Sequence, residues 1–317
     1  PRRAPSPGGA TEGGKAMKTN RTMVVVFLAP ALIFFCAVFV FPILRTLVMS
    51  AFHVENVTSS LNQWRYVGFD NYQELMGTSL FRISMWNLVR IWAVGGVVVM
   101  ALALLLAVIL NSGIRFKKFF RAVIYMPNII SAVALATMWL QYVYNPRFGL
   151  LTTFFNSIGL TSLASVQWTD TVHKFWALLG AYCFGMVGYH MLIFSSGIEK
   201  IPAEYYEAST IDGAGQLGQF LHITCPLLKG VTKTNITMWS ITSVGFFVWS
   251  QLFSTVTADT QTITPMVYLY TLVFGAGNTV TERNAGMGAA VGVVLCLCVV
   301  AVFLIVNWAI KDDDLEF

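Results

Sequence analysis

Six long apolar runs constrain this chain more than any other feature of its sequence. Each approaches the roughly 20 helical residues that cross a hydrocarbon core about 30 Å thick. Hydrophobic residues make up 56% of the 317 residues and charged residues only 11%, against about a quarter in soluble domains. A soluble fold could not bury so much apolar surface, so we predict an all-α, polytopic transmembrane helical bundle. Its six spans are expected at residues 24–44, 88–110, 122–142, 175–194, 234–253 and 286–310.

The fifth run is the least apolar of the six. Its aliphatic and aromatic residues are mixed with hydroxyl and amide side chains, namely Thr237, Ser240, Thr242, Ser243, Ser250 and Gln251. Such side chains are costly against lipid but expected against other helices or an aqueous path. We therefore expect this span to face the protein interior or a solute path.

Lysine and arginine residues set the expected orientation, because basic residues near span ends are retained on the cytoplasmic side. With the N-terminus inside, the inner segments hold most of the 20 basic residues, including a cluster at residues 115–121 between the second and third spans. We therefore predict an N-in, C-in protein. The net charge of +5 then follows from membrane topology, and no nucleic-acid partner is indicated.

Both ends of the chain are expected to lie outside the transmembrane domain, which we place at residues 23–312. Residues 1–22 are basic and rich in Pro, Gly and small polar residues, so a disordered tail is predicted. Residues 313–317 form an acidic C-terminal tail. The first apolar run is too long for the core of a secretory signal, and no small-residue cleavage site follows it.

The cysteines and histidines indicate no metal, cofactor or disulfide site in this chain. Four of the five cysteines lie in expected spans, and the four histidines are scattered without metal-ligand spacing. Cys296 and Cys298 are about 200° apart around a helix, so they cannot close on one metal ion.

The segment between the fourth and fifth spans has the signals of a helical hairpin. Pro202 suits a first helical position, residues 203–211 favour a helix, and Gly213 can supply a left-handed stop. Apolar residues at helical spacing predict a second helix over residues 216–224, which Pro226 would end.

This hairpin resembles the EAA motif of ABC-importer permeases, which reads Glu-Ala-Ala, three residues, Gly, nine residues, Ile, one residue, Leu-Pro. The matching positions are Glu207, Ala208, Ser209, Gly213, Ile223, Cys225 and Pro226. Serine replaces the second alanine and cysteine replaces the leucine, so both departures keep a small or apolar side chain.

The resemblance implies that this coupling loop, residues 197–230, docks into a separate ATPase subunit and transmits its closure. The implied coupling residues are Glu204, Glu207, Ala208, Ser209, Asp212, Gly213, Ile223 and Pro226. A coupling element must be stiff, small enough to enter a cleft and charged to fix its register. The alternative interpretation is an ordinary amphipathic loop on the membrane surface.

Nucleotide chemistry is not expected in this chain. Gly213, Gly215 and Gly218 satisfy the G-x-G-x-x-G spacing, but no buried strand precedes them and expected spans flank the segment. The sequence also lacks G-x-x-x-x-G-K-[ST]. We therefore interpret the chain as a non-catalytic transport subunit, with ATP and magnesium bound by partner ATPase subunits.

Further stretches resemble the carbohydrate branch of these permeases, the maltose-type and glycerol-phosphate-type inner-membrane components. They are Phe41-Pro42, Ser50–Phe52, Val67–Tyr72, Asn145-Pro146, Gly149–Leu151 and Gly286–Ala290. Where the family commonly has T-x-G-G-P outside the fifth span, this chain has Thr257–Thr262. The resemblance implies a multi-pass protein of a bacterial or archaeal inner membrane, surrounded by lipid, that carries a small sugar. Its implied partners are a second, different permease, two ATPase subunits and an extracytoplasmic binding protein.

A sugar path would be lined by hydroxyl and amide groups, with aromatic rings that stack on apolar sugar faces. The candidates are Ser240, Ser243, Trp249 and Gln251 in the fifth span and Asn307 in the sixth. Hydrogen bonding between helices is the alternative role for each of them.

An ion-driven secondary transporter is the alternative function. Such carriers usually place charged residues within the membrane, whereas the middle of each expected span lacks Asp, Glu, Lys and Arg. An intramembrane enzyme is a third interpretation, which no H-E-x-x-H or G-x-S-x-G sequence supports.

Overall fold

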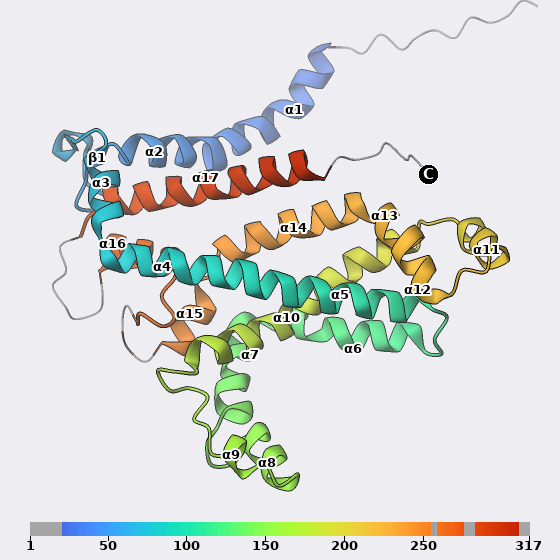
Figure 1. Ribbon diagram of the computed structural model, residues 1–317. Coiled ribbons are helices and arrows are strands. Elements are labelled where there is room, and N and C mark those ends of the chain that lie inside the picture. The colour runs from blue at the N-terminus through green and yellow to red at the C-terminus, as the bar shows by residue number, and fades with distance from the viewer. Residues whose placement is uncertain (1–20, 255, 257–258, 276–282, 311–317) are drawn as a thin grey trace, which may run out of the picture. The chain divides into compact units, whose positions relative to one another are not determined.

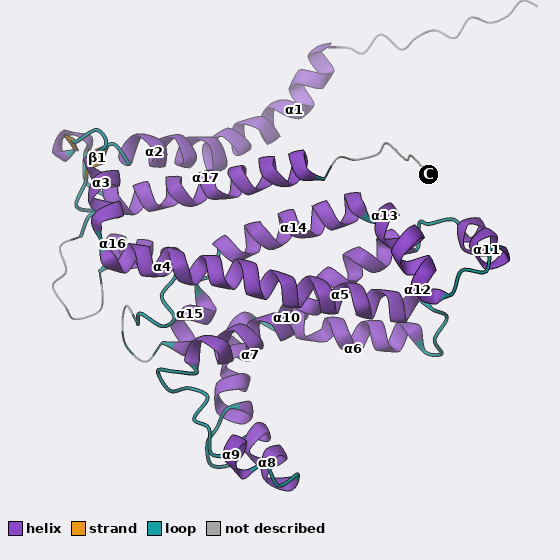
Figure 2. Cartoon of the chain, viewed as in Figure 1, coloured by secondary structure: helices purple, strands orange, loops and turns teal. Residues whose placement is uncertain are grey.

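The computed structural model describes residues 21–254, 256, 259–275 and 283–310, which are mostly helical (Figure 1, Figure 2). The expected all-α class is therefore confirmed. Two short strands, β1 (Phe52–His53) and β2 (Arg65–Tyr66), pair antiparallel. The tails expected at residues 1–22 and 313–317 lie outside the described residues, apart from the first two residues of α1.

The chain divides into two compact units after Arg45. The first unit holds α1 (Arg21–Phe35), the π-helical turn η1 (Cys36–Val40) and the start of α2 (Phe41–Met49). The helix Val25–Met49 is long and apolar enough to cross a membrane, close to the span expected at residues 24–44. Its apolar side chains are largely exposed, as lipid contact requires.

The longest described helix belongs to the second unit and runs from Ser79 to Asn111. It consists of α4 (Ser79–Arg90), the π-helical turn η3 (Ile91–Gly95) and α5 (Gly96–Asn111). It begins well before the span expected at residues 88–110. Its first turns carry Arg82 and Asn87, which lower a hydropathy average although they do not interrupt the helix.

The third expected span is broken. In place of one helix over residues 122–142, α6 (Lys117–Ile129) is followed by α7 (Ala132–Met138) and its extension η4 (Trp139–Val143), with a bend of 98° between them. Ser131 lies at the bend, where its hydroxyl caps α7 by accepting from the Ala134 amide at 3.3 Å. This cap lets a new helix begin in a different direction.

Helix α10 (Lys174–Ile198) lies at the centre of the second unit, with α5, α6 and α14 (Lys229–Val244) packed against it. Small residues allow this packing. A Cβ added at Gly188 would lie 2.3 Å from the Ile124 carbonyl oxygen, and one at Gly96 would lie 2.8 Å from Trp239 Nε1. Both glycines are therefore places where helices approach too closely for a side chain.

The fifth expected span, residues 234–253, consists of α14 and α15 (Val248–Phe253), separated by a break at residues 245–247. After it comes α16 (Pro265–Phe274), which the sequence did not predict because its ten residues are too short for a span. It packs against α17 (Ala285–Ala309), the last expected span.

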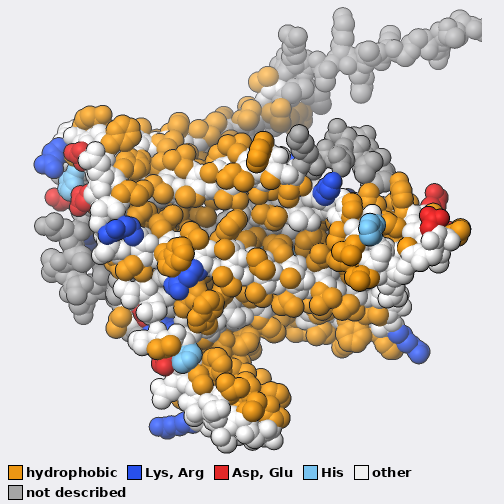
Figure 3. Space-filling view, viewed as in Figure 1, with side chains coloured by type: hydrophobic (Ala, Val, Ile, Leu, Met, Phe, Trp, Pro, Cys, Tyr) orange, Lys and Arg blue, Asp and Glu red, His pale blue; other side chains and the backbone are white. Residues whose placement is uncertain are grey.

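The remaining helices of the described chain are short. They are η2 (Leu61–Gln63), α3 (Asp70–Gly77), α8 (Leu150–Ser157), α9 (Thr161–Ala164), α11 (Ala203–Ile211), α12 (Gln216–Gln219), η5 (Phe220–Thr224) and α13 (Cys225–Leu227). Helices α11 to α13 mark one end, called the hairpin end, whereas β1, α3 and the start of α4 mark the opposite end (Figure 1). Charged side chains gather toward these ends, and hydrophobic side chains dominate between them (Figure 3).

Candidate coupling hairpin and solute path

The expected hairpin turns at Gly213, whose φ of +81° lies in the left-handed region. The Ala214 amide donates to the Ser209 carbonyl at 2.9 Å, and the Gly213 amide donates to the Thr210 carbonyl at 3.1 Å. These two bonds form a Schellman motif, which satisfies the last carbonyls of α11. Gly213 thus has the conformation that the sequence predicted.

Gln219 ties the two arms of the hairpin together. From α12, its Nε2 lies 3.0 Å from Ser209 Oγ, 3.0 Å from Thr210 Oγ1 and 3.3 Å from the Tyr206 carbonyl of α11. A second link joins Tyr206 Oη to Thr224 Oγ1 at 3.0 Å. Sequence reasoning predicted Ser209 but missed Tyr206, Thr210, Gln219 and Thr224, because the family motif does not include these four and their pairing depends on how the arms fold.

Pro226 does not end the second arm, contrary to expectation. The arm continues through η5 into α13, where Pro226 occupies the first turn. A proline is tolerated there because a first-turn amide needs no partner within the helix. Pro202 stands one position earlier than expected, immediately before α11.

The coupling residues predicted from the motif are mostly exposed. Ser209 and Ile223 are half-buried, whereas the exposed ones are Glu204, Glu207, Ala208, Asp212, Gly213 and Pro226. Large apolar side chains accompany them, with Ile211 exposed by 88% and Leu217 by 72%. The hairpin therefore presents acidic and apolar groups together, as a protein-binding surface does.

The base of the hairpin is fixed by charge. Glu199, directly after α10, accepts hydrogen bonds from Lys117 Nζ at 2.9 Å and from Arg121 of α6. The bonds from Lys117 and Arg121 hold the pKa of the Glu199 carboxyl below its ordinary value. Ser195 Oγ also accepts from Arg121 at 2.7 Å and from Asn111 at 2.9 Å. The ends of α5, α6 and α10 are thus joined where the hairpin begins.

The five path candidates lie in different surroundings. Ser240 is buried and accepts a hydrogen bond from Trp92 Nε1 at 2.9 Å, which is the interhelical role. Ser243 is fully buried, and its Oγ has no hydrogen-bond partner among the described residues. Gln251 is half-buried in α15, whereas Asn307 is half-buried near the C-terminal end of α17. Ser240 and Ser243 are one turn apart on α14, whereas Gln251 and Asn307 belong to other helices.

A hollow of about 150 Å³ lies where the breaks in the third and fifth spans meet. Its lining includes Asn128 and Ile130 beside the α6–α7 bend, Tyr182 and Gly185 of α10, and Trp249 of α15. At membrane depth, backbone leaves the helical form only where protein buries it or a cavity adjoins it. Of the five path candidates, only Trp249 lines this hollow, and sequence reasoning missed Asn128 and Tyr182.

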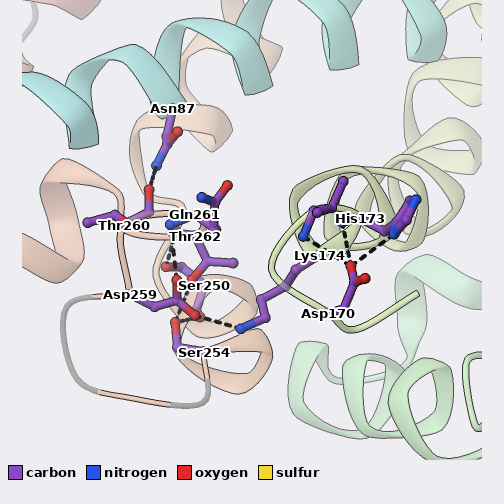
Figure 4. A network of polar contacts seen from close by, with 11 residues as sticks. Asn87, Asp170, His173, Lys174, Ser250, Ser254, Asp259, Thr260, Gln261 and Thr262 are labelled. Atoms are coloured by element: carbon purple, nitrogen blue, oxygen red, sulfur yellow. Dashed lines mark hydrogen bonds and ion pairs between the residues drawn. The ribbon is translucent and has the colours of Figure 1, made fainter. Parts of the chain in front are cut away.

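The loop between α15 and α16 is held by hydrogen bonds from several elements (Figure 4). Ser250 Oγ donates to the Thr262 carbonyl, and Thr264 Oγ1 donates to the Phe246 carbonyl at 2.6 Å. From α4, Asn87 Nδ2 donates to the Thr260 carbonyl at 3.0 Å. The described part of the segment that departs from T-x-G-G-P is therefore a specifically bonded structure.

The family model for the binding-protein-dependent transport system inner membrane component matches residues 99–311. The chain belongs to this family. The match includes the hairpin and both broken spans, so these features lie within the part that the family shares.

Curated relatives indicate the carbohydrate class. The arabinooligosaccharides transport system permease AraP of Bacillus subtilis is 29% identical over 95% of this chain and 93% of its own length. The probable permease YurN of the same organism is 32% identical over 69% and 74%. The sulfoquinovosyl glycerol permease SmoG of Agrobacterium fabrum is 28% identical over 90% of each chain. The chain is thus an inner membrane component of an ABC transporter, and its curated relatives include carbohydrate permeases.

Solved structures share the fold. A chain of a bacterial ABC transporter that imports the acidic polysaccharide alginate superposes with a TM-score of 0.77, at 18% identity, over 92% of this chain and 96% of its own. A bacterial alginate ABC transporter in complex with an alginate pentasaccharide-bound periplasmic protein gives a TM-score of 0.76, also at 18% identity.

Proposed function

We propose that this permease forms half of a sugar path and that the hairpin of α11 to α13 transmits closure of an ATPase subunit to it. The main support is the set of hydrogen bonds from Gln219 to α11, which we call the clamp. Because Gln219 holds both arms, a push on the exposed tip moves the hairpin as one piece. Glu199 then passes that motion to α6 and α10 through Lys117 and Arg121.

The proposed membrane topology has six spans with both termini inside. Four helices of the described chain are each long and apolar enough to cross a membrane, and we count the bent α6–α7 pair as a fifth span. We count α14–α15 as the sixth because its polar side chains Asn235, Ser240 and Ser243 are buried against other helices. The hairpin end carries the basic residues Lys117, Arg121, Lys200, Lys229 and Lys233, which supports a cytoplasmic location for it.

The proposed solute is a saccharide, which passes the hollow between the two broken spans. Tyr182 and Trp249 offer aromatic faces, and Asn128 offers an amide. Relatives are described as permeases for arabinooligosaccharides, lactose and diacetylchitobiose. In this proposal the extracytoplasmic binding protein delivers the sugar to the opposite end. A second, different permease completes the path, and two ATPase subunits bind ATP and magnesium.

The clamp is tested by purifying the complex from native membranes through a tag on this chain. Gln219→Ala is expected to retain the ATPase subunit but to lower the sugar transported per ATP hydrolysed. Gln216→Ala is the matched control, because Gln216 is exposed on the same arm. Equal transport per ATP in both variants would contradict the clamp.

Docking is tested by reversing a charge. Glu207→Arg is expected to reduce recovery of the ATPase subunit while leaving membrane insertion intact, because Glu207 is exposed on the docking surface. Glu55→Arg reverses an exposed charge at the opposite end and should leave recovery unchanged. Full ATPase recovery with Glu207→Arg would refute the docking role.

A further inference from the structure

An open hollow of about 530 Å³ lies at the opposite end of the second unit, between α4 and the α15–α16 loop. It is distinct from the hollow beside Trp249, and six of its eight lining residues have polar or charged side chains. The residues that line it are Ser79, Arg82, Ile83, Trp86, Asn87, Arg90, Thr260 and Gln261. We call it the arginine hollow.

Two arginines and a tryptophan form its long wall. Arg82, Trp86 and Arg90 are spaced by four residues, so they share one face of α4. Arg82 and Arg90 are about 12 Å apart along the helix axis, with Trp86 between them. The Trp86 side chain is 61% exposed, so its ring is available to a ligand.

The deeper arginine is held in place. Arg90 Cζ lies 3.9 Å from the ring centroid of Phe175, and its guanidinium donates to Asn87 Oδ1. Asn87 is buried, and its Nδ2 donates to the Thr260 and Ile263 carbonyls at 3.0 and 2.9 Å. One amide side chain thus orders both the arginine and the loop that closes the hollow. Arg90 Nε is buried and has no hydrogen-bond partner in the described part of the chain.

The charge of the arginine hollow is unbalanced. Among the described residues that line it are two guanidinium groups and no carboxylate. The neighbouring acid, Asp259, is paired with Lys174, and its carboxylate accepts a hydrogen bond from the backbone N–H of Gln261 at 3.0 Å. A site with free positive charge beside an aromatic face suits a ring that carries an oxyanion, because guanidinium groups bind carboxylates in pairs of parallel hydrogen bonds.

We propose that the arginine hollow is an entry site for an anionic saccharide, one that carries a carboxylate or sulfonate. Trp86 stacks on the sugar ring, Arg82 and Arg90 bind the anionic group, and Gln261 binds hydroxyl groups. This inference rests on the proposed function and narrows its substrate class. An anionic lipid headgroup carries related oxyanion chemistry, so the test separates the two.

The test uses the whole complex in phosphatidylcholine nanodiscs and two probes, D-galacturonate and D-galactose, which differ at one carbon. Binding is measured by saturation-transfer NMR titration. Galacturonate is expected to bind at least tenfold more tightly than galactose, and Arg82→Gln should remove that preference. Arg147→Gln removes an exposed arginine outside the hollow and should preserve it.

Equal binding of the two sugars, or equal galacturonate binding by the Arg82→Gln and Arg147→Gln complexes, would overturn the inference. Displacement of galacturonate by phosphatidylglycerol in the nanodisc would also overturn it, since a lipid would then be the occupant. Recovery of the ATPase subunit requires no sugar. A complex that retains the ATPase but lacks the anion preference therefore counts against the arginine hollow alone.

Discussion

Lys174 Nζ lies 2.7 Å from Asp259 Oδ2, which joins the first residue of α10 to the loop between α15 and α16 (Figure 4). The two side chains are only 3% and 9% exposed. Charges removed from water are tolerated as a pair, because either one alone keeps its desolvation penalty. The position of this loop therefore depends on α10.

Lys174→Met is expected to destabilise the protein by about 3–5 kcal/mol, because Asp259 is left as a buried unpaired charge. The double variant Lys174→Met with Asp259→Leu should recover most of that loss, since no charge remains buried. Thermal unfolding of the purified complex measures both effects. Lys118→Met, at an exposed lysine, is the control. A double variant no more stable than the single one would contradict the pairing.

The Glu199 carboxylate should make the stability of the protein depend on pH in the acid range. Its bonds from Lys117 and Arg121 lower the pKa of its carboxyl from 4.5. A carboxyl with a depressed folded-state pKa adds stability above its unfolded pKa and loses it as the pH falls through the folded value. The melting temperature should therefore fall more steeply below about pH 4.5 in the wild type than in Glu199→Gln. Parallel curves for the two proteins would show that this carboxylate contributes nothing.

Hydropathy located the long apolar helices approximately, but it did not predict where the third and fifth apolar runs are broken. A window average over residues 122–142 weighs apolar content and does not register a local helix cap such as Ser131, which lies at the 98° bend. The hairpin was predictable because its signals are local, as the left-handed Gly213 illustrates. By contrast, Lys174 and Asp259 are far apart in sequence, and only the folded chain pairs them.

For the path candidates, too, the sequence did not predict contacts between helices. Ser240 and Ser243 are equivalent in a hydropathy profile, yet one bonds Trp92 of another helix and the other has no partner among the described residues. Polar composition indicated that the fifth span faces inward. It could not distinguish a hydroxyl that bonds another helix, as in Ser240, from one without a partner in the described chain, as in Ser243.

These two serines give a matched pair of variants. Ser240→Ala is expected to destabilise the protein by about 1–3 kcal/mol, because Trp92 Nε1 loses its acceptor. Ser243→Ala should be neutral or slightly stabilising, since it removes a buried hydroxyl without a partner in the described chain. Thermal unfolding compares the two. A larger loss of stability with Ser243→Ala would contradict the assignment of the Trp92 bond.

Sugar uptake by the Ser243→Ala complex tests whether Ser243 lines the proposed path. Because this change is not expected to affect folding, a lower sugar uptake rate at normal assembly would identify Ser243 as a path residue. We expect such a decrease for Ser243→Ala, and for Gln251→Ala in α15. Wild-type uptake in both variants would remove these residues from the proposed path.

Gly213 and Gly215 test whether backbone conformation shapes the hairpin. An added Cβ would meet nothing within 4 Å at either position, so crowding cannot distinguish them. Gly213 has a φ of +81°, whereas Gly215 has a φ of −75°, which any residue adopts. Gly213→Ala should therefore strain the turn by about 1–2 kcal/mol, and Gly215→Ala should not.

The strain is expected to appear as lost coupling before lost folding, because the hairpin is exposed and small beside the helical core. Gly213→Ala should lower the sugar transported per ATP hydrolysed at an unchanged melting temperature, and Gly213→Asp should do the same through strain and an added charge. Gly215→Ala should match the wild type in both measurements. If Gly213→Ala and Gly215→Ala transport equally well per ATP, the Schellman turn is not required for coupling, and the motif glycine acts in some way other than through its φ angle.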